Sequence, residues 1–126
     1  MRALALTALF AACACAPPQA PPPPPSAAFK LDCGRSYEAL SADVLALSDL
    51  KRSPATPGEP YRYYATGDGT LAFVLTDPGA PGHPAIFRQD AVRRDGATVM
   101  ETTGCPYGDE AGFAKVKTYL EGLKTR

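Results

Sequence analysis

A proline-rich segment near the amino end most constrains what this chain of 126 residues can fold into. Seven of the 14 prolines lie between Pro17 and Pro25. Proline fixes φ and lacks the amide donor, so this segment favours an extended polyproline II conformation with a rise of roughly 3.1 Å per residue. We therefore expect a Pro/Ala-rich linker over residues 13–28 and one folded domain over residues 29–126.

The segment before the linker has the composition of an export signal. Arg2 supplies one positive charge, and residues 3–12 are almost entirely apolar. This run is about half of the roughly 20 residues that a membrane-spanning helix requires, which predicts a signal peptide over residues 1–12. Its end, Leu9-Phe10-Ala11-Ala12-Cys13, resembles the lipobox of bacterial lipoproteins, with phenylalanine where leucine is usual. The resemblance implies that Cys13 is lipidated and becomes the mature amino terminus.

Two other fates of the amino-terminal segment are compatible with its sequence. Cleavage after Ala14 leaves Cys15 as the first residue, and an uncleaved segment acts as an anchor. All three fates place the domain outside the cytoplasm. A single acyl chain holds a protein only marginally, whereas the three chains of a mature bacterial lipoprotein suffice for stable anchoring. We expect a domain that is lipid-anchored in the cell envelope and faces the periplasm.

The composition of the chain excludes several classes of function. Thirteen Lys and Arg balance thirteen Asp and Glu, so the net charge is zero, unlike that of a basic nucleic-acid-binding domain. The sequence has no glycine-rich phosphate loop and no cluster of metal ligands, and Gly67-Asp68-Gly69 lacks the later ligands of a calcium loop. We therefore expect no cofactor, no bound metal and no nucleic-acid partner.

Cys33 and Cys105 lie near the two ends of the predicted domain. A small domain in an oxidising compartment needs a covalent link, and this pair would close a loop of about 73 residues. The chain-entropy estimate for such a loop is about 4 kcal/mol of stabilisation. The alternative is a reactive or metal-binding pair, but there is no Cys-x-x-Cys motif and only His83 could assist.

The periodicity of apolar residues predicts an α+β fold. Apolar residues at steps of three and four predict one helix from Ser36, its N-cap, to about Leu50, and a second that opens at Asp109 or Glu110. Four segments between them have the composition of strands, and these are residues 61–65, 71–76, 85–92 and 97–103. We expect a four-stranded antiparallel meander, flanked by the two helices, which pack on one face.

The dipeptide Asp95-Gly96 predicts a tight hairpin and with it the register of two strands. Counting back from the turn places Asp90 opposite Glu101. Directly opposed side chains lie about 5 Å apart at Cβ, and two carboxyl groups that close can share a proton. Retaining glycosidases use carboxyl groups separated by roughly 5–5.5 Å. The alternative is a solvated face on which arginines neutralise both carboxylates.

Four side chains are candidate ligand-binding residues: Tyr61, Tyr63, Tyr64 and His83. Tyrosines beside Arg62 suit the recognition of a protein or a sugar polymer, although tyrosine is equally suited to packing in a sheet. On a strand, Tyr61 and Tyr63 share one face, and Arg62 and Tyr64 share the other. His83 is the single histidine and lies in a loop, where functional residues concentrate. No serine has the Gly-x-Ser-x-Gly context, so we name no catalytic residue.

Several short motifs follow one another in the second half of the chain. They are Asp68-Gly69-Thr70, Thr76-Asp77-Pro78-Gly79, Gly82-His83-Pro84-Ala85-Ile86, Gly104-Cys105 and Tyr107-Gly108-Asp109. Together they resemble small exported bacterial proteins of unknown activity. The resemblance covers about half of the chain and implies an envelope location and one small α+β domain.

We therefore expect an envelope lipoprotein whose domain is a non-enzymatic module that binds a protein or a cell-wall polymer. One alternative is a small cell-wall hydrolase that acts through Asp90, Glu101 or His83. The other is an inhibitor that inserts the rigid loop Pro78–Pro84 into an envelope enzyme, because a rigid loop loses little entropy on binding.

Overall fold

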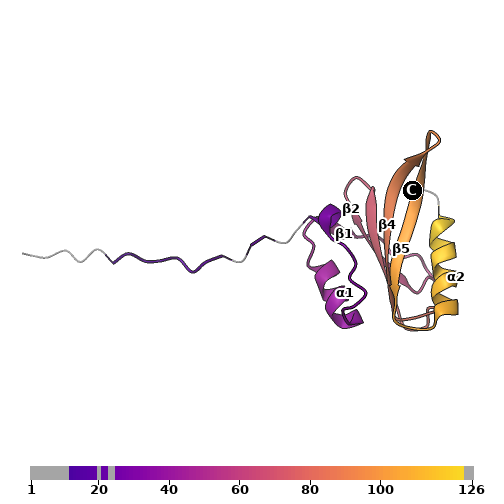
Figure 1. Cartoon of the computed structure of the whole chain (residues 1–126), viewed down its shortest axis with the longest axis horizontal. Helices are drawn as coiled ribbons and strands as arrows, with labels where there is room; N and C mark the ends of the chain where they lie inside the picture. Colours follow the sequence, from indigo (N-terminus) through magenta and orange to yellow (C-terminus); the bar gives the residue numbers. More distant parts are fainter. Residues whose placement is uncertain (1–11, 20, 23–24, 124–126) are drawn as a thin grey trace, which may run out of the picture.

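The computed structural model describes residues 12–19, 21–22 and 25–123, and Figure 1 shows a long extended segment that leads into a three-layer domain. One helix covers each face of a central sheet (Figure 1). The elements are η1 (Ser26–Ala28), α1 (Tyr37–Leu45), β1 (Leu50–Arg52), β2 (Tyr61–Thr66), β3 (Leu71–Thr76), β4 (Ala85–Arg94), β5 (Ala97–Pro106) and α2 (Glu110–Glu121).

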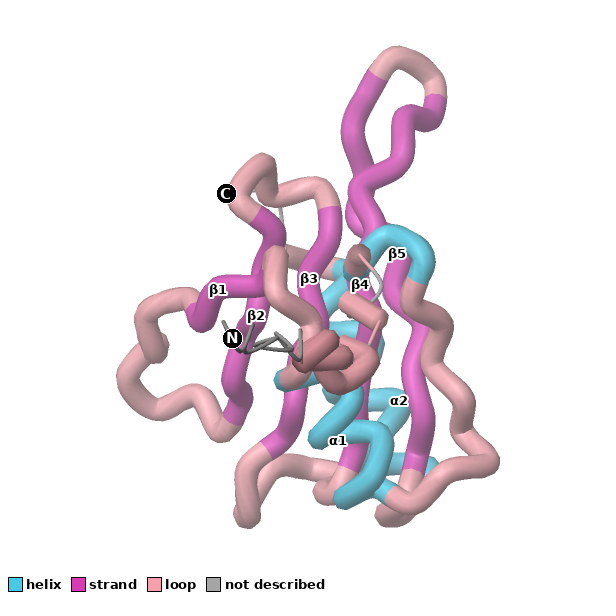
Figure 2. Tube along the Cα trace, turned by 90° about the vertical axis from the view of Figure 1, so that its left-hand side faces the viewer, coloured by secondary structure: helices cyan, strands magenta, loops and turns pink. Residues whose placement is uncertain are grey.

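The sheet is an antiparallel meander in the order β1-β2-β3-β4-β5, so the predicted α+β fold and meander are confirmed. It has five strands, however, and the prediction of four is wrong. The additional strand, β1, has three residues, which is too short to show alternation in the sequence. It is defined by its pairing with β2, which places Leu50 opposite Thr66. Figure 2 shows the strands of the sheet side by side, with the β4–β5 hairpin extending beyond the others.

Helix α1 begins where the sequence predicts and ends earlier. The Ser36 hydroxyl accepts a hydrogen bond from the Ala39 N–H at 3.2 Å, which confirms the N-cap. The predicted end at about Leu50 is wrong, because the helix ends at Leu45 and Leu50 pairs in β1 instead. Leu47 is still buried in the core, so its place in the apolar pattern reflects packing after the helix has ended.

The two helices lie on opposite faces of the sheet, and the prediction that both pack on one face is wrong (Figure 1). Phe73 of β3 lies in the same core cluster as Leu40 of α1. Its neighbour Val74 points to the other face and lies in a second cluster with Val116 and Leu120 of α2. Because successive residues of a strand point to opposite faces, a central strand that is apolar on both faces needs a cover on each.

Helix α2 confirms the second predicted helix. Its N-cap is Asp109, whose carboxylate accepts a hydrogen bond from the Gly112 N–H at 2.7 Å. Its buried side chains include Val116 and Leu120, which are separated by one turn as the apolar stripe predicts. The stripe therefore positions this helix against Val74 and Phe87 of the sheet.

The predicted disulfide between Cys33 and Cys105 is confirmed, with the two Cα atoms 5.2 Å apart. Cys105 on β5 is completely buried, whereas Cys33 is exposed. The bond joins the segment before α1 to the end of β5, on the α1 face of the sheet.

The residues of the linker that the structure describes up to Pro22 are exposed and lie in no helix or strand, and the thiols of Cys13 and Cys15 are free. Residues 1–11, on which the predicted signal peptide falls, lie outside the described residues. Among the described residues, no helix is long and apolar enough to cross a membrane. Contact with the domain begins at Ser26, whose buried hydroxyl donates to the Asp49 carboxylate at 2.6 Å.

Candidate functional site

The loop between β3 and β4 packs against the amino end of α2. A Cβ atom at Gly112 would lie 2.1 Å from the Gly82 nitrogen, and one at Gly108 would lie 2.5 Å from the Gly82 carbonyl oxygen. Ala80 in the same loop is buried. The loop proposed as an inhibitory plug is therefore fixed against α2. We call this part of the molecule, where the loop meets the amino ends of both helices and the disulfide, the closed end.

His83 takes part in a polar and aromatic cluster at the closed end. Its Nδ1 lies 2.8 Å from the Thr76 hydroxyl, which also accepts a hydrogen bond from the Ala85 N–H at 2.9 Å. The ring meets Tyr37 edge-on at 6.0 Å, and Tyr37 meets Tyr107 in the same way at 5.8 Å. These contacts position His83 to hold the loop in place.

The three candidate tyrosines do not form one surface. Tyr61 and Tyr63 pack with the α2 cluster, whereas Tyr64 packs with the α1 cluster on the other face. The alternation predicted for this strand is thus confirmed, and it separates the side chains. Tyr61 contacts the ring of Tyr119 at 5.8 Å, and the Tyr119 hydroxyl donates to the Glu59 carboxylate.

Burial changes the acidity of the tyrosines on the α2 face. It raises the pKa of Tyr63 well above its ordinary value, with a smaller contribution from the negative charge of Glu59. Burial and Glu59 also raise the pKa of Tyr61. The Tyr63 hydroxyl is buried near the Glu59 carboxylate, and no hydrogen bond of ordinary geometry joins it to another of the described residues. These hydroxyl groups therefore stay protonated well above neutral pH.

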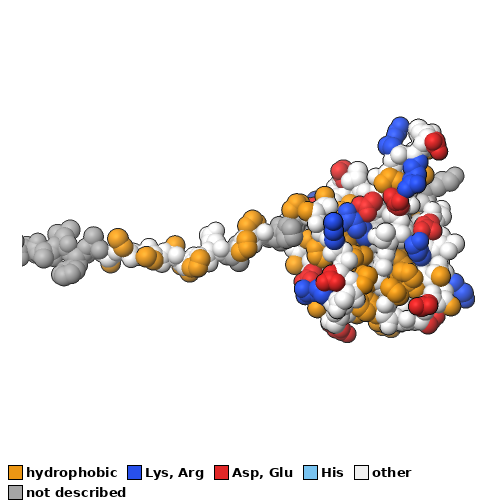
Figure 3. Space-filling view, viewed as in Figure 1, with side chains coloured by type: hydrophobic (Ala, Val, Ile, Leu, Met, Phe, Trp, Pro, Cys, Tyr) orange, Lys and Arg blue, Asp and Glu red, His pale blue; other side chains and the backbone are white. Residues whose placement is uncertain are grey.

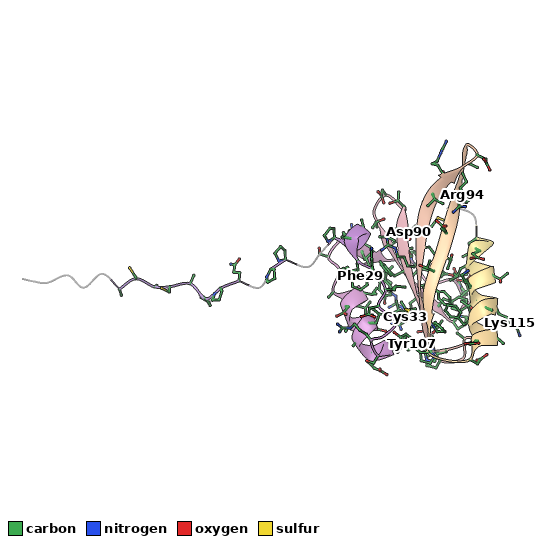
Figure 4. The ribbon with its side chains drawn as sticks, viewed as in Figure 1. Phe29, Cys33, Asp90, Arg94, Tyr107 and Lys115 are labelled. Carbon is green, nitrogen blue, oxygen red and sulfur yellow. A yellow bond between two sulfur atoms is a disulfide. The ribbon has the colours of Figure 1, made fainter. Side chains whose placement is uncertain are left out.

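Asp90 lies opposite Glu101, as the hairpin register predicts. Each carboxylate has its own arginine: Arg88 binds Asp90 through two contacts of 2.8 Å, and Arg94 binds Glu101 at 2.6 Å. Figure 4 labels Asp90 and Arg94 on the hairpin. Because each carboxylate is bound by its own arginine, this geometry favours a solvated face of ion pairs over a catalytic carboxyl pair.

Arg88 also fastens the segment before α1 to the sheet. Besides binding Asp90, its guanidinium donates to the carbonyl oxygens of Phe29 and Ala27. The hydrogen bonds to Asp90 raise the pKa of Arg88 further above its already high value. A groove of about 340 Å³ lies beside it, with Lys30, Cys33 and Thr103 in its walls. The groove joins residues far apart in the sequence, so no local motif signals it.

A second, smaller cavity lies on the other face of the sheet, beyond the last turn of α2. Its volume is about 240 Å³, and its walls include Tyr63, Ala72 and Met100. Of the residues proposed from the sequence as ligand-binding, Tyr63 lies in the wall of this cavity.

The outer edge of β5 is an open surface of the domain. β5 has ten residues with Glu101 as its one charged side chain, whereas β1 at the other edge has three residues and carries Lys51 and Arg52. Within the described residues, no main-chain hydrogen bond joins β5 to a segment outside the strand other than β4. Figure 3 shows hydrophobic side chains gathered between the two helices on this side, where Figure 4 labels Cys33 and Tyr107.

Metal ligands do not gather in the part of the chain that the structure describes: no group of three or more His, Cys, Asp or Glu side chains is placed to hold an ion. Comparison of the chain with protein-family models, with curated proteins and with solved structures finds no match.

Proposed function

We propose that this chain is an exported lipoprotein of the bacterial cell envelope, attached through Cys13, whose domain is a non-enzymatic module that binds another envelope protein. The observation that carries the proposal is the pairing of an exposed proline-rich segment with a disulfide-closed domain that leaves one long strand edge unpaired. The segment holds the domain away from its point of attachment, and the edge offers a surface for a partner.

The edge of β5 supports a protein partner in particular. An unpaired strand presents a row of N–H and C=O groups that an extended segment of another protein can satisfy, and neighbouring side chains then set specificity. Thr103 on β5 and Cys33 beside it are exposed, and Tyr107 is half-buried. A patch of hydrophobic side chains such as the one between the two helices in Figure 3 is typical of protein-binding sites.

Photo-crosslinking in cells that produce the full chain tests the partner. A photoreactive side chain is placed at Thr103 on the proposed surface and, as the control, at Lys115 on the exposed side of α2. We expect position 103 to give an adduct with one envelope protein and position 115 to give none. An adduct with a wall polymer instead, equal adducts from both positions, or no adduct from position 103 contradicts a protein partner at this edge.

Fractionation tests the attachment independently. The variant Cys13→Ser removes the proposed lipidated thiol, and Cys15→Ser is the matched control two residues away. We expect the Cys13 variant to leave the membrane fraction and the Cys15 variant to remain there. If both variants remain in the membrane fraction, attachment through Cys13 is wrong.

A further inference from the structure

The cavity on the α2 face results from small side chains at a point that the helix does not reach. α2 ends at Glu121, and beyond it the sheet presents Ala65 of β2 beside Ala72 of β3, which are directly paired. Around these alanines stand Tyr63, Met100 and Leu123, which line a half-open pocket of about 240 Å³. An apolar cavity of about 150 Å³ is already large enough to bind benzene.

The polar side chain Gln89 lies in the wall of the cavity, and among the described residues its amide nitrogen is hydrogen-bonded whereas its amide oxygen is not. Gln89 is 5 % exposed, and its Nε2 donates to the Leu120 carbonyl oxygen at 3.2 Å. Because a carbonyl can only accept, this contact fixes the amide with Oε1 turned away from the helix. No residue in the described part of the chain donates a hydrogen bond to Oε1.

The direct partner of Gln89 on β5 is Thr102, which is 4 % exposed and does not line the cavity. The acceptor that the cavity itself offers to an incoming donor is therefore Gln89 Oε1.

We infer that this cavity is a binding site for a small, uncharged, mainly apolar molecule that carries one hydroxyl or N–H group. The apolar part fits against Ala65, Ala72 and Met100, and the donor is accepted by Gln89 Oε1. None of the described residues that line the cavity is charged, which disfavours an ionic ligand because a buried charge needs a partner. The site is separate from the β5 edge and needs neither the lipid nor a protein partner.

A methionine label gives a direct readout of this site. The chain has two methionines, Met1 and Met100, and the first lies in the segment that we propose is removed, so ¹³C-methyl methionine gives the mature protein one probe, in the cavity wall. The mature protein is titrated with benzyl alcohol and, separately, with toluene, which has the same ring and lacks the hydroxyl. We expect both to shift the Met100 signal saturably, with benzyl alcohol binding about threefold to tenfold more tightly because of its hydrogen bond.

Two variants separate the apolar and polar parts of the proposal. Ala72→Leu fills the cavity and is expected to abolish the saturable shift with both compounds, and Ala65→Val serves the same purpose if the first variant does not fold. Gln89→Met keeps the volume but removes the acceptor, so it is expected to bind both compounds with equal affinity.

The inference is wrong if the Met100 signal moves without saturation, or if a folded cavity-filling variant binds as well as the original chain. A Gln89→Met variant that still prefers benzyl alcohol overturns the assignment of Gln89 as the acceptor.

Discussion

The two ends of the sheet are packed in opposite ways. At the closed end, backbone lies on backbone: Gly82 and Gly112 approach so closely that neither position has room for a Cβ atom, and the Cys33–Cys105 bond lies nearby. At the other end, which we call the open end, the β4–β5 hairpin extends beyond the other strands (Figure 2). The cavity beside Met100 lies on this side of the closed end. The comparison indicates that close backbone packing is concentrated at the closed end, next to which the proposed protein-binding surface of β5 lies, whereas the proposed small-molecule site lies toward the open end.

Removing the disulfide is expected to lower the free energy of unfolding more than any other change considered below. Replacing both Cys33 and Cys105 with alanine removes a crosslink between residues 72 positions apart, for which the chain-entropy estimate is about 4 kcal/mol. Urea denaturation of the oxidised protein and of the double variant measures the difference. A loss of unfolding free energy below about 1 kcal/mol would mean that glycine packing stabilises the closed end without help from the disulfide.

Glycine packing at the closed end is tested by Gly112→Ala. The new methyl group would lie 2.1 Å from the Gly82 nitrogen, so the loop must move, and we expect a loss on the order of 3 kcal/mol. The matched control is Gly67→Ala in the β2–β3 turn, where a Cβ atom meets nothing within 4 Å. Its thermal denaturation midpoint should stay near that of the original chain. Equal losses in the two variants would contradict the close contact.

Two arginine–carboxylate ion pairs of the β4–β5 hairpin differ in burial, so losing them should change the free energy of unfolding by different amounts. The side chain of Arg88 is 16 % exposed and also binds the segment before α1, whereas that of Arg94 is 62 % exposed near the hairpin tip. We expect Arg88→Ala to cost about 2 kcal/mol, because hydrogen bonds to charged groups are lost at a partly buried site. Arg94→Ala should cost about 0.5 kcal/mol or less, as exposed pairs do. Chemical denaturation of both variants checks the order, and a reversed order would contradict it.

Tyr63, in the cavity wall, is expected to give the smallest effect at neutral pH. No hydrogen bond of ordinary geometry joins its buried hydroxyl to another described residue, so Tyr63→Phe should change the free energy of unfolding by about zero to 0.5 kcal/mol.

The effect of Tyr63 appears at alkaline pH. Burial raises its pKa in the folded state, so the stability it contributes is present below its ordinary value of about 10 and is lost as the pH rises above it. Thermal denaturation between pH 9 and pH 11, roughly the window set by that ordinary value, should show a shallower decline for Tyr63→Phe. An identical decline in both proteins would mean that Tyr63 is not desolvated.

Local features of the fold could be predicted because short-range chemistry determines them. Ser36 and Asp109 have the side chains that cap helices, and the structure shows both as N-caps. Asp95 and Gly96 adopt the positive φ angles of a tight hairpin turn, and the turn sets the pairing of Asp90 with Glu101.

The errors concern packing between distant elements. An apolar stripe shows which side of a helix is buried, but not which face of the sheet it covers. The signal for opposite faces was present in β3, where Phe73 and Val74 are both fully buried. Strand β1 is too short to form a pattern, and the cavity arises only when Ala65 and Ala72 meet across two strands.

The most direct test of the central claim is the mass of the mature protein isolated from bacterial envelopes. We expect residues 1–12 to be absent, Cys13 to be the first residue with covalent lipid attached, and Cys33 to remain bonded to Cys105 without reductant. A chain that retains Met1, carries no lipid and has reduced thiols at both disulfide positions would contradict export and attachment together.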